Sequence, residues 1–338
     1  MKILVTGGTG FLGTHLVPRL LALGHHVRVL GRSASPPALA QAEYVQGDLL
    51  NASVVARALS DVDAVYHLAG RVSFRPEEAR KMFELHVDAT RELLRLIGAL
   101  ERKPRVILAS TSGAIAVSRE ERICTEDDDY PFTVVGRWPY YLSKIYEEKL
   151  ALSFCQKENI PLLVLNPALL MGPGDERLSS TWLVAKFLSR DIPSMPRGGL
   201  ALVDVRDAAD TFVQALTKGA PFQRYLLGTN LAMPEFFARL ERLTGVPAPR
   251  LRLPPVLNIL GAQLLEKLAL RTDAPHPMEV EMGEHFFYLD ASRAQRDLGF
   301  RARDVQETLL DTVQDILSRM PKNALPGTFG KMARLRSS

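Results

Sequence analysis

Two groups of side chains in this 338-residue chain could move a proton on and off an alcohol or carbonyl oxygen. Tyr140 and Lys144 are four residues apart, so in a helix both would lie on one face. A lysine ammonium beside a phenol stabilises the phenolate and lowers the pKa of the tyrosine toward working pH. Taken alone, such a pair is usually a solvated helix face. Upstream, however, a hydroxyl-rich run ends an apolar segment and could hold a substrate oxygen against the tyrosine: Ser110, Thr111 and Ser112.

A second pattern lies at the N-terminus and concerns phosphate binding. Gly7, Gly10 and Gly13 are spaced by three, between an apolar run at 3–5 and a helix-like apolar repeat over 16–23. A strand, a glycine turn and a helix together present backbone N–H groups and a positive helix end to a phosphate. Gly7 would permit the tight turn, Gly10 the approach of a pyrophosphate, and Gly13 close helix packing. The stretch predicts a dinucleotide-binding turn, with chance glycines in an ordinary loop as the alternative.

The elements that would position these residues alternate between strands and helices. This alternation predicts an α/β fold with a Rossmann-like, doubly wound parallel sheet. The predicted strands cover 3–5, 26–30, 44–45, 64–69, 106–110 and 162–165, and the predicted helices include 52–59, 77–101 and 140–159. We assign 1–171 to the dinucleotide-binding domain, with 202–216 returning to it, 172–201 and 217–320 to a smaller substrate lobe, and 321–338 to a basic, flexible tail.

The composition is typical of a globular enzyme, with 46% hydrophobic and 24% charged residues. The net charge of +4 comes without a dense Lys/Arg stripe, so no nucleic-acid partner is expected. Cys124 and Cys155 indicate neither a disulfide framework nor a metal site, and the histidines are not grouped as metal ligands. The chain starts directly with a predicted strand, so a cytoplasmic location without a signal peptide is expected.

The longest apolar stretch, at 256–270, is interrupted by polar residues and is too short to span a bilayer. Its leucines recur at helical spacing. We predict that they belong to the core, because Lys and Arg do not flank them. The alternatives are a lip of the substrate cleft and a contact with a membrane surface. The leucines of this stripe are Leu257, Leu260, Leu264, Leu265 and Leu268.

Several motifs, in this order, resemble those of the extended, epimerase/dehydratase-like branch of the short-chain dehydrogenase/reductase superfamily. Within that branch the chain is similar to dihydroflavonol reductases and hydroxysteroid dehydrogenases. The resemblance covers residues 1 to 317, and its motifs are weak singly but strong together. They lie at 6–13, 47–49, 67–69, 109–112, 139–144, 166–167 with 172–174, 203–209, 290–291 and 298–300.

The resemblance implies roles for individual residues. Tyr140 would be the general acid/base, Lys144 would hold the nicotinamide ribose and tune Tyr140, and Ser112 would position the substrate oxygen. Gly113, Leu170 and Arg177 are assigned to the substrate. The residues implied to contact the cofactor are Gly7, Thr9, Gly10, Phe11, Leu12, Gly13, Arg32, Asp48, Leu49, Leu68, Ala69, Ser110, Tyr140, Lys144 and Pro167.

The end of the second predicted strand bears on which dinucleotide is bound. NAD-preferring proteins place a carboxylate there, which accepts hydrogen bonds from the ribose hydroxyls. In this chain Gly31 occupies that position and Arg32 follows it. Arg32 could pair with a 2′-phosphate, for which Gly31 leaves room, so NADP(H) is favoured over NAD(H). The alternative is that Arg32 is a surface charge or stacks on adenine.

Three departures from the resemblance narrow the reaction. His86 occupies a position where relatives usually carry Asn. We expect it to be harmless because only the backbone matters there; the alternative is that the side chain is needed, in which case His86 would shift the geometry or relay protons. Gly113 and Ala114 replace the acid pair of sugar dehydratases, which argues against dehydration. Leu200 stands near the place of an arginine that clamps a sugar-nucleotide diphosphate, so a smaller or more apolar carbonyl compound is favoured.

These observations predict an NADP(H)-dependent oxidoreductase that reduces a ketone or aldehyde, or oxidises the alcohol. One alternative is an NAD-dependent nucleotide-sugar epimerase that uses the same Ser112, Tyr140 and Lys144. A more remote alternative is a dinucleotide-sensing protein without turnover. The substrate is left open. So is the oligomeric state, since relatives commonly dimerise through the helices that here would be 77–101 and 140–159.

Overall fold

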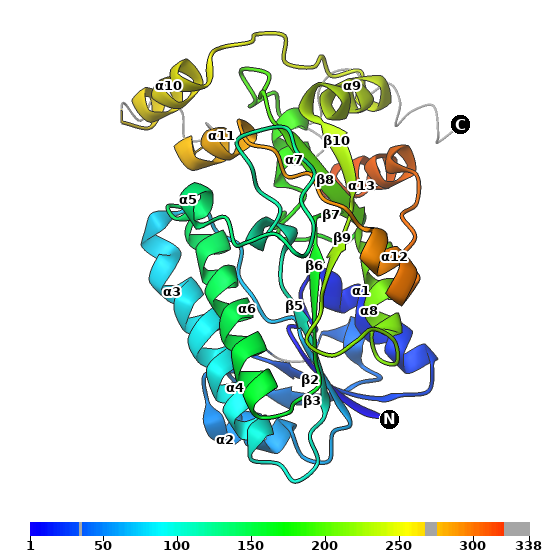
Figure 1. The fold of residues 1–338 in the computed structure, drawn as a ribbon. Helices are drawn as coiled ribbons and strands as arrows, with labels where there is room; N and C mark the ends of the chain where they lie inside the picture. The colour runs from blue at the N-terminus through cyan, green and yellow to red at the C-terminus, as the bar shows by residue number, and fades with distance from the viewer. Residues whose placement is uncertain (34–35, 268–275, 321–338) are drawn as a thin grey trace, which may run out of the picture.

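A computed structural model of the protein describes residues 1–33, 36–267 and 276–320, and the predicted tail at 321–338 lies outside them (Figure 1). The strands are β1 (Lys2–Thr6), β2 (His26–Gly31), β3 (Glu43–Gln46), β4 (Ala64–His67), β5 (Arg105–Ala109), β6 (Leu162–Pro167), β7 (Leu169–Met171), β8 (Gly199–Asp204), β9 (Arg224–Leu227) and β10 (Thr229–Ala232). The α-helices are α1 (Phe11–Ala22), α2 (Ala52–Ala58), α3 (Ala79–Phe83), α4 (Ala89–Gly98), α5 (Phe132–Val135), α6 (Pro139–Lys157), α7 (Trp182–Leu188), α8 (Val205–Gln214), α9 (Met233–Thr244), α10 (Pro255–Lys267), α11 (Pro277–Gly283), α12 (Ser292–Leu298) and α13 (Val305–Arg319).

The large sheet has the strand order β3-β2-β1-β4-β5-β6-β9, and every neighbouring pair in it is parallel. The predicted Rossmann-like, doubly wound parallel sheet is therefore confirmed. Thr6, at the end of β1, pairs with Leu30 on one side and with His67 on the other. The strand order reverses between β1 and β4, and a ligand crevice opens at such a switch point, outside the carboxyl ends of the strands.

Helices cover both faces of the large sheet, which is why its strands are apolar in both directions (Figure 1). Ile3 and Val5 point to the face covered by α1 and α8, where they pack in one core cluster with Leu16. Leu4 points to the face covered by α2, α4 and α6, where it packs in a second cluster with Leu93. The alternation along β1 fixes both layers, because successive side chains of a strand point to opposite faces.

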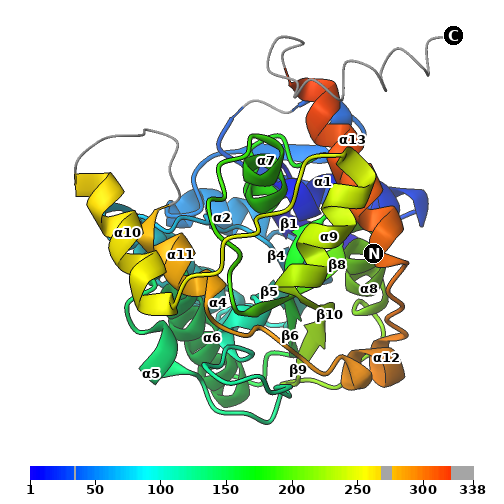
Figure 2. The same cartoon turned by 90° about the horizontal axis from the view of Figure 1, so that it is seen from above.

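A smaller lobe lies above the carboxyl ends of the large sheet (Figure 2). Its sheet has the order β10-β8-β7 and packs with α7, α9 and α13 around a third core cluster. The lobe boundaries differ from those predicted at 171 and 217, because the chain crosses between the two lobes more often than predicted. β7 and β8 belong to the small sheet, whereas β9 pairs with β6 in the large one. The chain returns to the large sheet because α8 packs against α1 on one face of that sheet. The segment after α8 then leads to β9 at the edge of the sheet.

Two predicted elements differ from the structure. The helix expected over 77–101 is interrupted by a π-helical turn at Glu84–Asp88, whose physical reason is given below. The leucine stripe expected in the core is exposed instead, with Leu257, Leu260 and Leu264 each more than half accessible. The reason is that α10 packs on α11 and buries Asn258 and Ala262, which lie on the other side of the helix. Leu268 lies outside the described residues.

Candidate active site

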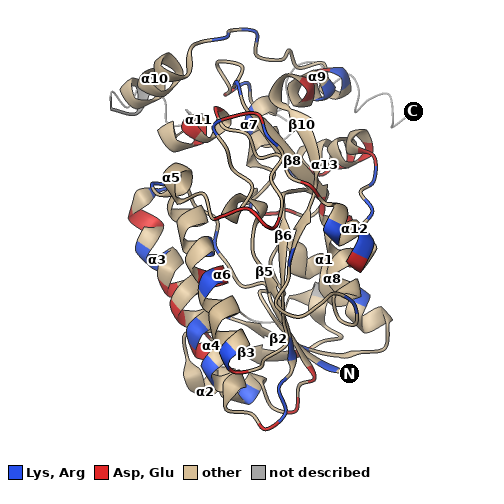
Figure 3. Ribbon diagram, viewed as in Figure 1, with Lys and Arg blue, Asp and Glu red and all other residues tan. Residues whose placement is uncertain are grey.

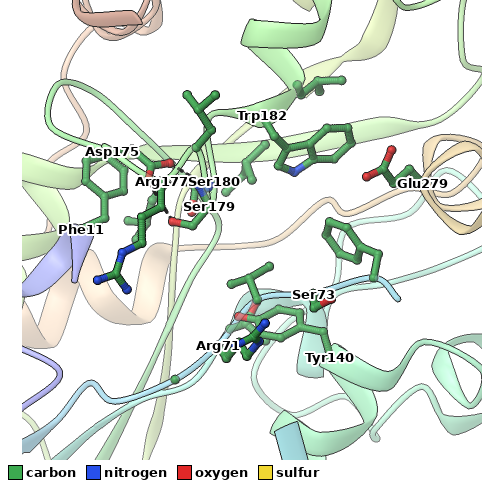
Figure 4. A pocket seen from close by; sticks show the side chains of 18 of the residues that line it. Phe11, Arg71, Ser73, Tyr140, Asp175, Arg177, Ser179, Ser180, Trp182 and Glu279 are labelled. Atoms are coloured by element: carbon green, nitrogen blue, oxygen red, sulfur yellow. Dashed lines mark hydrogen bonds between the residues drawn. The ribbon is translucent and has the colours of Figure 1, made fainter. Parts of the chain in front are cut away.

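A cleft of about 2660 Å³ runs between the large sheet and the small lobe. Figure 4 shows its lining, with Phe11 of α1 at one end and Trp182 of α7 and Glu279 of α11 at the other. Pockets for a single small molecule are usually roughly 300–1,000 Å³. The cleft is thus large enough for a dinucleotide together with a second molecule.

The glycine turn forms the floor of one end of the cleft, and two of its glycines cannot be replaced without a clash. Gly7 has a φ of +72°, and a Cβ there would lie 2.6 Å from the backbone N of Ala69. A Cβ at Gly13 would lie 2.5 Å from the carbonyl oxygen of Gly7. The first glycine therefore permits the turn and the third permits close packing of α1, as the spacing predicts.

The N-terminus of α1 opens into this end of the cleft. Gly10 is its N-cap and provides no side-chain cap, and the first turn of α1 contains no acidic residue. Its free N–H groups and the positive end of the helix dipole suit a pyrophosphate. Nearby, the buried Ser110 hydroxyl lines the cleft and has no hydrogen-bond partner within the described part of the chain. The residues present therefore fit a dinucleotide.

Tyr140 lies in the first turn of α6 and faces the cleft (Figure 4). Burial raises the pKa of its phenol to about 12, although a hydrogen bond with the Thr111 hydroxyl lowers that pKa and the negative charge of Glu147 raises it. Tyr140 is thus a neutral acid at physiological pH. Thr111 was not singled out from the sequence. It precedes Ser112, the residue assigned to this place, and both line the cleft.

Lys144 is one helical turn after Tyr140 and is almost fully buried. Its ammonium donates a hydrogen bond of 2.7 Å to the carbonyl oxygen of Ala109 and forms an ion pair with Glu147, a carboxylate with no exposed surface. The expected lowering of the Tyr140 pKa by Lys144 is not found, because Glu147 neutralises the ammonium and its own charge acts on the phenol in the opposite sense.

Glu147 ends a buried hydrogen-bond chain that crosses from α6 to β1. The Thr90 hydroxyl donates to Glu147 Oε1 (3.1 Å) and lies 2.8 Å from His67 Nε2, while His67 Nδ1 lies 2.7 Å from the Thr6 hydroxyl. Because the Thr90 hydrogen is given to Glu147, the chain assigns the His67 proton to Nε2. Burial lowers the pKa of His67 to about 3, so the ring is neutral. The chain connects Lys144 to the end of β1, where the glycine turn begins.

His86 lies in the π-helical turn and holds two segments against α6. The Arg71 N–H donates to His86 Nε2 (3.0 Å), so the proton is on Nδ1, which contacts the Ser143 hydroxyl at 2.8 Å. Ser143 in turn donates to the carbonyl oxygen of Tyr140. Burial lowers the pKa of His86 well below its usual value. The side chain therefore packs and positions the turn that carries Tyr140, and its contacts account for the interrupted helix.

The two buried rings predict how stability depends on pH. His67 and His86 are neutral in the folded state and gain protons in the unfolded state, so the unfolded state binds more protons as the pH falls below about 6.5. The free energy of unfolding should then decrease by up to about 1.4 kcal/mol per pH unit for each ring. Urea unfolding at pH values from 7.5 to 5.5 would measure it. His86→Asn removes one ring and should reduce the slope of the unfolding free energy against pH. An unchanged slope would refute the assignment of His86 as a neutral ring in the folded state.

The end of β2 has Gly31 in the place of the carboxylate typical of NAD-preferring proteins. A Cβ at Gly31 would lie 2.1 Å from the hydroxyl of Tyr44, which fills the space of a side chain there. Among the described residues, the Tyr44 hydroxyl has no hydrogen-bond partner. Arg32 follows, is exposed, lines the cleft and forms no ion pair with any described residue. The end of β2 therefore offers Arg32 and no carboxylate to a ribose substituent, although Asp48, which follows β3, also lines the cleft.

The opposite end of the cleft contains a group of apolar side chains. Phe74 packs edge-on against Trp182 with ring centroids 5.8 Å apart, and Leu170 and Leu200 also line this end. Leu200 is buried in the place where sugar-nucleotide enzymes were expected to carry an arginine. A charged pair, Lys186 and Glu279 at 2.6 Å, joins α7 to α11 there.

The structure brings nearly all of the predicted site residues into this one cleft. Gly113 does not line it, since a Cβ at Gly113 would lie 2.0 Å from the ring of Tyr141, which packs over it. Arg177 is exposed and lies on the same side of the cleft as Phe11 (Figure 4). The predicted residues that line the cleft are Gly7, Thr9, Gly10, Phe11, Leu12, Gly13, Arg32, Asp48, Leu49, Leu68, Ala69, Ser110, Ser112, Tyr140, Lys144, Pro167, Leu170 and Arg177.

Comparison with known proteins adds a family. Residues 3–228 match the profile of the NAD dependent epimerase/dehydratase family. A putative dihydroflavonol 4-reductase of Synechocystis sp. is 31% identical over 328 residues, covering 91% of this chain and 92% of the relative. Sterol demethylase protein B of Methylococcus capsulatus is 29% identical over 330 residues, covering 93% and 97%. The crystal structure of gox2253 has a TM-score of 0.81 and 26% identity, covering 95% of this chain and 99% of that one.

Proposed function

The chain belongs to the NAD-dependent epimerase/dehydratase family, and we propose that it is an NADP(H)-dependent reductase of an apolar ketone or aldehyde. As a member of this family it is an enzyme, an NAD(P)-dependent oxidoreductase or epimerase. The single observation that carries the narrower proposal is the apolar end of the cleft, with Leu200 and Trp182 beyond the Tyr140 hydroxyl.

The chemistry on oxygen would be carried by the chain's own residues. A nicotinamide dinucleotide bound in the cleft would supply the hydride for the carbonyl carbon. Tyr140, which is neutral because its pKa is about 12, gives its proton to the carbonyl oxygen. The hydroxyls of Thr111 and Ser112 hold that oxygen at the phenol, and Lys144 holds the nicotinamide ribose. Oxidation of the alcohol would run the same steps in reverse, with Tyr140 accepting the proton.

The preference for NADP(H) rests on the end of β2. Arg32 has no carboxylate partner among the described residues, and its planar guanidinium can bind a phosphate through two hydrogen bonds. Position 31 is a glycine, so no carboxylate stands at the end of β2 to repel a phosphate. The cation of Arg32 and the absence of a carboxylate at position 31 both favour an anion at the ribose 2′ position.

Arg32→Ser should weaken NADPH binding by about 10- to 100-fold, the value of a lost charge-assisted hydrogen-bond pair, and should leave NADH binding nearly unchanged. Titration of the native protein with each dinucleotide, followed by nicotinamide fluorescence, would measure both constants. Arg57→Ser on α2 is a matched control, because Arg57 is also exposed but does not line the cleft. Equal losses for NADPH and NADH would contradict the role of Arg32.

The substrate class follows from the lining. Leu200 stands near the place expected for the arginine that clamps a diphosphate. Two of the cations that line the cleft are already paired, Lys186 with Glu279 and Arg71 with Glu78. Arg197, the nearest arginine in sequence, does not line the cleft. The names of the Synechocystis and Methylococcus relatives, a putative dihydroflavonol 4-reductase and a sterol demethylase protein, do not refer to a nucleotide sugar.

One experiment separates the reductase from the epimerase. The purified protein is denatured, any released dinucleotide is identified by mass spectrometry, and the native protein is then titrated with NADPH and NADH. An empty site that binds NADPH more tightly supports the reductase, and a panel of apolar ketones and aldehydes is then screened for NADPH oxidation. Stoichiometric NAD that does not wash out would favour the epimerase and refute the proposal.

A further inference from the structure

The helix α10 presents its apolar side chains to solvent rather than to the core. Val256, Leu257, Leu260 and Leu264 are 66%, 53%, 53% and 57% exposed. Val256, Leu260 and Leu264 follow the i, i+4, i+8 spacing of one helix face, and Leu257 adjoins them three residues before Leu260. We call these four residues the α10 stripe. On the other side of the helix, Asn258 is buried and binds Ser194 and Glu284. The helix is therefore held to the lobe by polar contacts, while its apolar face has no partner among the described residues.

The stripe is not simply part of the substrate cleft. Leu257 lines the cleft mouth, together with Leu253 and Gly261, but Val256, Leu260 and Leu264 do not line it. Both views of the fold place α10 at the outer edge of the small lobe, beside α11 (Figures 1 and 2). The apolar face thus points outward from the rim of the cleft.

Unpaired positive charge accompanies the stripe. Arg250 and Arg252 lie in the exposed segment that leads into α10, and Arg242 is in the last turn of α9. Figure 3 shows this basic connection next to a nearly uncharged α10. Within the described parts of the chain, none of these three arginines forms an ion pair. The sequence-based argument against a membrane contact, that Lys and Arg do not flank the stripe, is therefore wrong for its N-terminal side.

We propose that the α10 stripe and Arg250 and Arg252 bind the surface of an anionic lipid bilayer. Exposed leucines on one helix face beside free arginines form the pattern of a helix that lies in the membrane interface. Among the described residues no helix is long and apolar enough to cross a bilayer, so the contact would be peripheral. A symmetric dimer through this face fits less well, because it would bring the unpaired arginines of both copies together.

The consequence for the site rests on the proposed function. Leu253 and Leu257 belong to both the cleft mouth and the α10 region, so binding to a bilayer would place the mouth at the lipid surface. An apolar carbonyl compound dissolved in the bilayer could then enter the cleft without crossing water. The binding itself requires neither cofactor nor substrate, and can be tested without them.

The test is flotation of the full-length protein with vesicles of phosphatidylcholine alone and of phosphatidylcholine with phosphatidylglycerol. We expect binding to the anionic vesicles that decreases as salt is added. Leu260→Gln with Leu264→Gln should reduce the partition coefficient about tenfold or more, as should Arg250→Glu with Arg252→Glu. Leu23→Gln is the matched control, because Leu23 is equally exposed (59%) at the end of α1, far from the stripe in sequence.

The outcomes distinguish this proposal from the proposed function. Wild-type protein that ignores anionic vesicles, or a double leucine variant that binds as well as wild type, would overturn it. So would a wild-type dimer, seen by light scattering, that the leucine variant converts to a monomer. The rate at which a water-soluble carbonyl compound is reduced should be the same for the wild type and for the double leucine variant. If the protein floats with anionic vesicles but reduces no carbonyl compound, the membrane-binding proposal is supported and the proposed reductase function is refuted.

Discussion

Tyr140→Phe should reduce kcat for carbonyl reduction by about 10²–10⁴-fold, the usual contribution of a general acid. The phenol of Tyr140 lines the cleft, and its hydroxyl is hydrogen-bonded with Thr111. Phenylalanine keeps the ring, which contacts His86 edge-on at a centroid distance of 6.1 Å, so the packing should survive. The expected loss is therefore in chemistry, with NADPH affinity changed by less than about tenfold.

Steady-state rates and NADPH fluorescence titration would measure the two effects separately. Tyr146→Phe is the matched control, since Tyr146 is on the same helix but is 45% exposed and does not line the cleft. A Tyr140→Phe protein that binds NADPH and retains wild-type kcat would show that another group delivers the proton. The variant does not distinguish reductase from epimerase, because both would use this phenol.

Local patterns in the sequence were enough to predict the parts of the site that lie within one short segment. The spacing of Gly7, Gly10 and Gly13 predicts the turn because the positive φ of Gly7 and the close approach of Gly10 and Gly13 to the Gly7 carbonyl are local, whereas the approach of Gly7 to Ala69 is not. The pair Tyr140 and Lys144 likewise depends only on the geometry of a single helix. The doubly wound sheet follows from the alternation of apolar strands and helices, which is again a local signal.

Other features depended on how distant segments meet. Glu147 lies seven residues after Tyr140 and three after Lys144, so helical spacing alone places it on the same face, and this signal was available. Its burial, however, results from Thr90 and His67, which come from α4 and β4. The choice between Thr111 and Ser112 depended on the exact path after β5. For α10, periodicity detected an apolar face but contained no information about what would cover it.

Glu147→Gln should change both the stability and the pH dependence of the enzyme. Removing one partner of a buried ion pair leaves Lys144 as an uncompensated charge, which typically costs about 3–5 kcal/mol of unfolding free energy. The pKa of Tyr140 should fall for two reasons. The negative charge that raises it is gone, and the Lys144 ammonium is no longer neutralised.

The direction of the activity change follows from the role of Tyr140. In alcohol oxidation the phenolate is the base, so with a pKa of about 12 the wild-type rate should rise about tenfold per pH unit across pH 7 to 10 without a plateau. In Glu147→Gln the whole profile should shift to lower pH. Oxidation at pH 8 should then be faster by about tenfold for each unit by which the pKa of Tyr140 falls. Carbonyl reduction, which needs the neutral phenol, should instead begin to decline at a lower pH than in wild type.

Glu148→Gln provides the matched control for this shift. Glu148 is the next residue and is equally buried, but it binds Tyr130 and Asn166 on another side of α6. Its loss should also destabilise the fold, yet it should leave the pH profile of oxidation in place. If Glu147→Gln lowers the melting temperature but its pH profile of oxidation coincides with that of Glu148→Gln, the Glu147 carboxylate has only a structural role. If the profile moves in Glu147→Gln but not in Glu148→Gln, Glu147 sets the acidity of Tyr140 by holding the charge of Lys144.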